Sequence, residues 1–171
     1  MSDELIVRHC SPTLAGLKAG SLFSCRYASP RDLTAELRRL NRALSPKGLR
    51  VLPLQARDGR ALIYLYRPRA LLEERGYGPD AAPRCLAQLA RKLRAGETFP
   101  HEIGLFLSYP PGDVRGFICN GACRHKCAGC WKVYGDEAAA RRTFEAWQRC
   151  TRIYSRRLAQ GCPLEQLAVA G

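Results

Sequence analysis

The segment Ala56-Arg57-Asp58-Gly59 constrains the fold more than any other feature, because it lies between two runs of strand-forming residues, 49–55 and 60–66. An Asp-Gly pair between two such runs favours a tight hairpin turn. The second run contains Ile63-Tyr64-Leu65-Tyr66 and is apolar throughout, which is typical of a strand with a neighbour on each side. The sequence therefore predicts an antiparallel hairpin whose second strand is central.

The other elements follow from hydrophobic periodicity, proline and capping residues. Together they predict one α+β domain over residues 1–171: a mainly antiparallel sheet of four or five strands, with helices packed on it, ending in a long C-terminal helix. Further strands are expected at 5–7, 21–27, from His101 to Tyr109, and at 131–134. Helices are expected at 30–44, 68–75, 79–94, from Gly112 onward, at 137–158 and near the end of the chain, with Gly76-Tyr77-Gly78 between the second and the third.

Size and cysteine content indicate where such a chain works. With 171 residues and 46% hydrophobic composition it is long enough to bury a core without disulfides. The nine cysteines are an odd number and no export signal precedes them, so a reducing cytoplasm is expected. No apolar run approaches the roughly 20 residues that a membrane-spanning helix needs, which excludes a membrane span.

A strong excess of basic residues indicates anionic partners. Lysine and arginine number 28 against 15 acidic residues, giving a formal net charge of +13. Such a charge favours nucleic acid, acidic lipid headgroups or anionic cofactors. Most of the basic residues are arginines scattered over the predicted helices, which favours solvated helix faces. A basic nucleic-acid-binding module is therefore kept as an alternative interpretation.

Four cysteines lie close together at positions 119, 123, 127 and 130. The last three have the CxxxCxxC spacing with which radical S-adenosylmethionine enzymes hold an iron-sulfur cluster, but the 41 residues that follow are too few for the barrel of those enzymes. Thiolates at these intervals suit an iron-sulfur cluster or zinc. The sequence thus offers Cys119, Cys123, Cys127 and Cys130 as metal ligands, or as reduced surface thiols.

Polar residues suited to a ligand site occur in three places. His101 begins an apolar run and is a candidate proton carrier, metal ligand or axial haem ligand, or a structural histidine. Lys18 belongs to a segment of small residues, and such segments let a backbone approach an anion closely. Lys132 follows Trp131, so it is a second candidate contact for an anion. Tyr109 and Tyr134 would supply orienting hydroxyl groups.

These residues give the leading hypothesis, a cytoplasmic protein that binds a small anionic ligand or cofactor. It expects Lys18, His101 and Lys132 to converge on one cavity, although they lie far apart in the sequence. No nucleophile and base can be paired from their spacing, so the hypothesis concerns binding and leaves catalysis open.

Three longer motifs extend this interpretation: CSPTLAGLKAGSLFSC, HEIGLFLSYPPGDVRGF, and CWKVYGD before an alanine-rich helix containing Phe144 and Cys150. Over nearly the whole chain they resemble the domain-of-unknown-function family 3793 of anaerobic Firmicutes. The resemblance implies no defined activity. It does imply a connection to iron, haem or redox chemistry, because members are associated with iron-uptake and flavodoxin genes. It also implies that tyrosine can replace Cys130, which favours the pocket residues over the thiol cluster.

Overall fold

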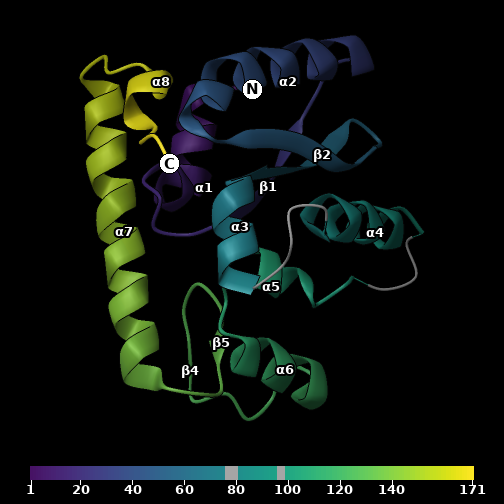
Figure 1. Cartoon of the computed structure of the whole chain (residues 1–171), viewed down its shortest axis with the longest axis vertical. Helices are drawn as coiled ribbons and strands as arrows, with labels where there is room; N and C mark the ends of the chain where they lie inside the picture. The colour runs from purple at the N-terminus through teal and green to yellow at the C-terminus, as the bar shows by residue number, and fades with distance from the viewer. Residues whose placement is uncertain (76–80, 96–98) are drawn as a thin grey trace.

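A three-stranded antiparallel sheet lies at the centre of the computed structural model, which describes residues 1–75, 81–95 and 99–171 (Figure 1). The strands β1 (Gly20–Arg26), β2 (Arg50–Arg57) and β3 (Arg60–Tyr66) lie in the order β1-β3-β2. Asp58 and Gly59 make the turn between β2 and β3 with φ angles of 53° and 70°. The predicted hairpin and its central second strand are therefore confirmed.

Helices surround this sheet and form most of the remaining chain. The predicted helices at 30–44, 68–75 and 137–158 are confirmed, and the Gly76-Tyr77-Gly78 separator lies outside the described residues. Among the described residues, every helix is too short or too polar to cross a lipid bilayer. The helices are α1 (Asp3–Leu14), α2 (Pro30–Leu44), the single 3-10 turn η1 (Ser45–Lys47), α3 (Pro68–Arg75), α4 (Ala81–Ala95), α5 (Ile103–Phe106), α6 (Pro111–Asn120), α7 (Glu137–Ala159) and α8 (Leu164–Leu167).

The two faces of the sheet bury different apolar cores. One face, which includes Phe23 and Ile63, packs against α1, α2 and α8. The other face, which includes the fully buried Tyr64, packs against α4 and α5. The Tyr64 hydroxyl donates a hydrogen bond of 2.6 Å to the carbonyl of Phe106, and a Cβ on Gly20 would lie only 2.2 Å from that hydroxyl. A glycine at the start of β1 therefore lets α5 approach the sheet.

The predicted strand at residues 5–7 is wrong, because these residues lie inside α1. The hydroxyl of Ser2 accepts a hydrogen bond from the amide of Leu5, and Asp3 and Glu4 occupy the first turn. An N-terminal cap followed by acidic residues favours a helix start. The apolar residues that suggested a strand, Ile6 among them, lie on the buried side of this helix.

The predicted buried strand between His101 and Tyr109 is also wrong. The chain there forms the single turn α5, in which local hydrogen bonds replace those of a sheet. The amide of Ile103 bonds to the carbonyl of Pro100, and the amide of Tyr109 bonds to the carbonyl of Gly104, each at 3.0 Å. A Cβ on Gly104 would lie 2.8 Å from the Val114 side chain, so a glycine is needed where α5 meets α6.

The predicted strand at 131–134 is shorter than expected and lies apart from the main sheet. It forms β5 (Lys132–Val133), which pairs antiparallel with β4 (Cys127–Ala128). The sheet of four or five strands is thus corrected to one sheet of three strands and a separate two-stranded hairpin in the described residues. Figure 1 shows this hairpin beside α6, at the opposite end of α7 from α8. The predicted long helix near the C-terminus is confirmed as α7, with Asp136 as its cap.

Candidate ligand cavity

A cavity of about 400 Å³ lies where β1, the α5 segment, α6 and the β4–β5 hairpin meet. Most of its lining is apolar, and aromatic rings form much of the wall. The side chains that shape it include Leu22, Ile103, Leu107, Val114, Phe117 and Trp131. The volume lies within the range of roughly 300–1,000 Å³ that is common for small-molecule sites.

Three of the residues that the sequence predicts as a site, His101, Tyr109 and Lys132, line this one cavity. His101 is exposed, and its ring meets the edge of Phe117 at a centroid distance of 4.8 Å. The Lys132 ammonium group donates a hydrogen bond of 3.0 Å to the carbonyl of Ala122, which fixes the direction of its side chain. The cavity therefore has a cation and an imidazole among apolar walls.

Asp113 is a further lining residue, and sequence reasoning missed its role. Its side chain is only 3% exposed, yet its carboxylate accepts three hydrogen bonds. The donors are the indole Nε1 of Trp131 at 2.7 Å and the backbone amides of Tyr134 at 2.8 Å and Gly135 at 2.7 Å. Asp113 therefore attaches the end of the hairpin to α6. An acidic residue in the first turn of a helix is the only sequence signal, and it indicates no more than a favourable helix start.

An aromatic cluster, formed by Tyr109, Trp131, Phe144 and Trp147, closes one side of the cavity. Trp131 stacks on Tyr109 at 5.0 Å and meets the rings of Phe144 at 4.5 Å and Trp147 at 5.6 Å. Burial is the main cause that raises the pKa of Tyr109 to about 12, and Cys130 adds to it. The phenol of Tyr109 is therefore neutral at physiological pH and a weak proton donor.

Lys18 lies on the other side of this cluster and does not line the cavity. Its ammonium nitrogen is 4.5 Å from the centroid of the Trp147 ring and 5.8 Å from that of Tyr109. It lines a separate groove between α1 and α7. The expected convergence of Lys18 with His101 and Lys132 is therefore corrected, because Lys18 lies against the rings of Trp147 and Tyr109 and lines a different hollow.

Tyr134 also lies away from the cavity lining, against α6. A Cβ on Gly116 would lie 2.5 Å from Cγ of its ring, so the ring occupies the space that a larger side chain would take. Its hydroxyl oxygen is buried and has no hydrogen-bond partner among the described residues. Burial raises the pKa of this phenol, with smaller contributions from Cys123 and Asp113. Tyr134 thus serves packing here, rather than orienting a ligand in the cavity.

We expect Tyr134→Phe to unfold at the same temperature as the parent protein or at a higher one. A buried hydroxyl without a partner loses its hydrogen bonds to water and gains none on folding. Thermal unfolding followed by circular dichroism measures the change, with Tyr27→Phe as the comparison at a site outside α6 and the hairpin. A clear loss of stability in Tyr134→Phe alone would show that its hydroxyl has a partner.

The four cysteines that were candidate metal ligands are distributed over different surroundings. Cys119, Cys123 and Cys130 are exposed, and Cys127 is half-buried against the aromatic cluster. Cys130 lines the groove that contains Lys18. Among the described residues, no three histidine, cysteine or acidic side chains are grouped to hold a metal ion. Metal binding by these thiols stays a prediction, which metal analysis and a visible spectrum after anaerobic purification would test.

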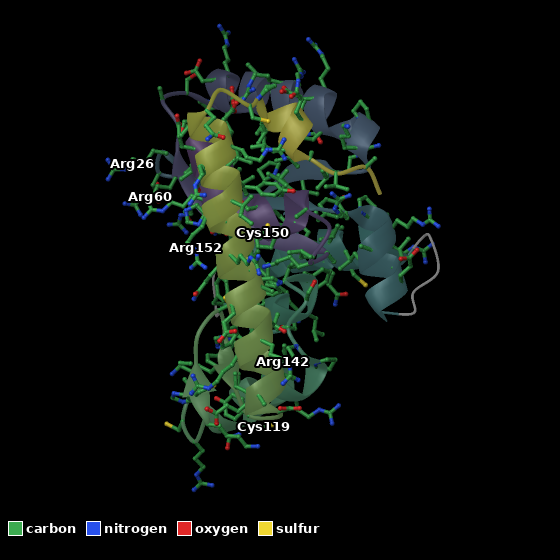
Figure 2. The ribbon with its side chains drawn as sticks, turned by 90° about the vertical axis from the view of Figure 1, so that its left-hand side faces the viewer. Arg26, Arg60, Cys119, Arg142, Cys150 and Arg152 are labelled. Carbon is green, nitrogen blue, oxygen red and sulfur yellow. The ribbon has the colours of Figure 1, made fainter. Side chains whose placement is uncertain are left out.

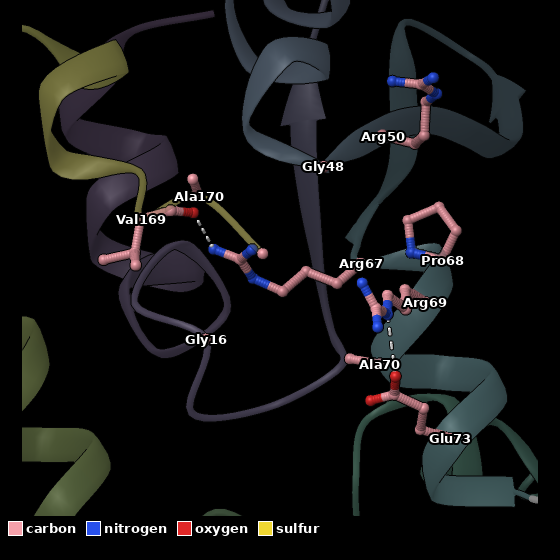
Figure 3. Close-up of a pocket in the computed structure, with 11 residues that line it drawn as sticks. Gly16, Gly48, Arg50, Arg67, Pro68, Arg69, Ala70, Glu73, Val169 and Ala170 are labelled. Atoms are coloured by element: carbon pink, nitrogen blue, oxygen red, sulfur yellow. Dashed lines mark hydrogen bonds and ion pairs between the residues drawn. The ribbon is translucent and has the colours of Figure 1, made fainter.

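A further hollow beside Arg67 is explained by the fold (Figure 3). The guanidinium of Arg67 is buried, and it donates hydrogen bonds of 2.7 Å to the carbonyls of Thr13, Leu14 and Val169. It thereby connects the end of α1 to the C-terminal segment. Arg69 in the same hollow forms a 3.0 Å salt bridge with Glu73. These cations already have partners, so this hollow is a weaker candidate for a ligand.

The fold and the cavity define a small α+β protein in which a helix-covered three-stranded sheet and a separate hairpin enclose a ligand-sized space. The chain belongs to the family described as protein of unknown function (DUF3793), whose model matches residues 6–168. Comparisons with curated proteins and with solved structures found no significant match. The family description states no activity.

Proposed function

We propose that the protein binds a small organic anion in the cavity lined by His101, Tyr109 and Lys132. The observation that carries this proposal is that three polar side chains, separate in the sequence, border one hollow whose other walls are mainly apolar. Small-molecule sites commonly combine such walls with a few polar groups that set orientation. The geometry favours a ligand with an apolar, planar body and one anionic group.

The charges around the cavity support an anion. Lys132 forms no salt bridge within the described part of the chain, and the carbonyl of Ala122 that it contacts is neutral. Among the described residues, Asp113 supplies the only carboxylate of the lining, and this carboxylate already accepts three N–H groups. Lys132 therefore provides positive charge for a ligand, and His101 provides a second polar contact on the same cavity. A flat apolar body would suit the rings of Tyr109 and Trp131.

The proposal concerns binding, and catalysis would need a proton carrier. His101 is the candidate among the lining residues, because burial raises the pKa of Tyr109 to about 12 and makes its phenol a weak proton donor. A cytoplasmic location, an origin in anaerobic Firmicutes and a link to iron, haem or redox chemistry stay predictions from the sequence. An organic acid that takes part in iron, haem or redox chemistry would agree with that predicted connection and with the apolar walls and positive charge of the cavity.

Titration with the fluorescent dye anilinonaphthalene sulfonate tests the proposal, because the dye joins an aromatic body to one sulfonate group. We expect saturable, equimolar binding to the parent protein. Lys132→Met is expected to weaken binding by about fivefold to tenfold, since a partly desolvated ion pair contributes roughly 1 kcal/mol. The change is measured by fluorescence at fixed salt concentration.

Lys126→Met is the matched control, because it removes the same charge from the same region. Lys126 is exposed, donates to the carbonyl of Gly135 and does not line the cavity. It should leave dye affinity within about twofold of the parent, as expected for an exposed charge that solvent and salt screen. Equal weakening in both variants, or no saturable binding to the folded parent, would refute the proposal.

A further inference from the structure

A basic groove lies between α1 and α7, on the opposite side of the aromatic cluster from the cavity. It has a volume of about 770 Å³, against about 400 Å³ for the cavity. Arg8 reaches it from α1, Lys18 from the loop after α1, and Arg152 and Arg156 from α7. In the described part of the chain, no aspartate or glutamate lines this groove. Four cationic side chains therefore line the groove, with no described acidic residue among them.

Three arginines line the groove: Arg8, Arg152 and Arg156. Arg152 and Arg156 are four residues apart on α7 and so lie on one stripe of the helix. Neither they nor Arg8 form a salt bridge with any described carboxylate, whereas Arg141 on the same helix pairs with Glu137. Figure 2 shows the Arg152 side chain to the left of α7, directed away from the helix. The groove thus brings together three arginines that form no salt bridge within the described part of the chain.

The fourth cation, Lys18, is held in position by the fold. Its ammonium group lies over the ring of Trp147 at 4.5 Å, a favourable cation–π arrangement. The loop that carries it is fixed at both sides, because the amide of Leu17 bonds to the carbonyl of Pro12 and the amide of Ala19 bonds to the hydroxyl of Ser108. Lys18 is therefore in place before a ligand arrives, which lowers the entropic cost of binding.

We propose that this groove binds a ligand that carries two or more phosphate groups. Guanidinium groups form paired hydrogen bonds to phosphate oxygens, and several cations around one open groove suit several phosphates better than a single carboxylate. Trp147 in the wall is 7% exposed and covered by Lys18, so it offers no free face on which a nucleobase could stack. The geometry therefore favours recognition of the phosphates themselves in a small oligophosphate.

Titration with inorganic tripolyphosphate, followed by calorimetry at low salt, tests this proposal. The double variant Arg152→Gln/Arg156→Gln is expected to weaken binding at least tenfold, or about 1.4 kcal/mol. The matched control is Arg142→Gln/Arg149→Gln, which removes the same charge from exposed positions on the same helix outside the groove. Arg8→Gln tests the opposite wall, and circular dichroism confirms that each variant is folded. Lys132→Met should leave tripolyphosphate affinity unchanged, which separates this site from the cavity.

The outcomes distinguish a site from general charge attraction. Selective loss in the groove variants supports the proposal, while equal loss in both double variants, or no binding by the parent, refutes it. A labelled oligothymidylate serves as a second probe that carries the same phosphates on a nucleic-acid backbone. Its displacement by tripolyphosphate supports recognition of phosphate groups in the groove. Binding that tripolyphosphate does not displace identifies a nucleic-acid surface and overturns the assignment to a small oligophosphate.

Discussion

Asp113→Asn is expected to lower the free energy of unfolding by about 2–4 kcal/mol, because one carboxylate oxygen becomes an amide that faces N–H donors. The two oxygens of Asp113 accept from the indole of Trp131 and from the amides of Tyr134 and Gly135. The amide group cannot accept all three, so at least one buried donor loses its partner. Urea unfolding with linear extrapolation measures the change.

Asp58→Asn is the control for this experiment. Asp58 is exposed in the β2–β3 turn with a φ angle of 53°, a conformation that asparagine tolerates well. The free energy of unfolding of the Asp58→Asn variant should stay within about 0.5 kcal/mol of that of the parent protein. A loss of similar size in both variants would mean that Asp113 has no special part in holding the hairpin to α6.

Trp131→Ala is expected to cost about 3–5 kcal/mol, the usual range for truncating a buried aromatic side chain. Trp131 is 9% exposed and contacts Tyr109, Phe144 and Trp147, so its removal leaves a void in the centre of the aromatic cluster. Trp131→Phe retains part of the packing but loses the hydrogen bond to Asp113, and its cost should be smaller. Both are measured by urea unfolding.

Combining Trp131→Phe with Asp113→Asn separates the hydrogen bond from the packing. Both changes remove the same indole–carboxylate hydrogen bond, so the double variant should lose less stability than the sum of the single variants. Strict additivity would contradict a direct contribution of that hydrogen bond.

For the Trp131→Ala prediction, a loss of less than about 1 kcal/mol in the free energy of unfolding would show that the cluster is not a packed core.

The sequence predicts the β2–β3 hairpin and the helices α2 and α7 well because their signals are local. Asp58-Gly59 specifies a turn by backbone conformation alone, and Ser29 before Pro30 specifies a helix start by a cap and a fixed φ angle. The cap at Asp136 works in the same way. None of these signals depends on contacts with distant parts of the chain, so each can be interpreted from the sequence alone.

The segment from His101 to Tyr109 could not be assigned in this way. Its apolar residues fit a strand and a buried turn equally well, and the choice depends on a distant contact. Gly104 packs against Val114 of α6, and Phe106 accepts a hydrogen bond from Tyr64 of the sheet. Residues 5–7 are a different case, because a local helix signal was present there. Ser2 caps the helix, but the short apolar run suggested a strand instead.

The candidate site residues were chosen by their side-chain chemistry, and the structure brings only some of them to one cavity. His101, Tyr109 and Lys132 line one cavity, whereas Lys18 lies beyond the aromatic cluster and Tyr134 lies against Gly116. Side-chain chemistry can indicate which residues could contact a ligand, but it does not show which of them share one cavity in the folded protein. The role of Asp113 could not be found at all, because its three partners are brought to it by the hairpin.

The chain contains two tryptophans, and each lines a different hollow: Trp131 the cavity and Trp147 the groove. This permits a direct test of the central claim, that an organic anion binds in the cavity. Protein labelled with fluorotryptophan gives one fluorine NMR signal from each, assigned with Trp131→Phe and Trp147→Phe. Titration with anilinonaphthalene sulfonate is predicted to shift the Trp131 signal most, and Lys132→Met should reduce that shift at the same dye concentration. Saturating dye that leaves the Trp131 signal in place, or shifts only Trp147, would contradict the account.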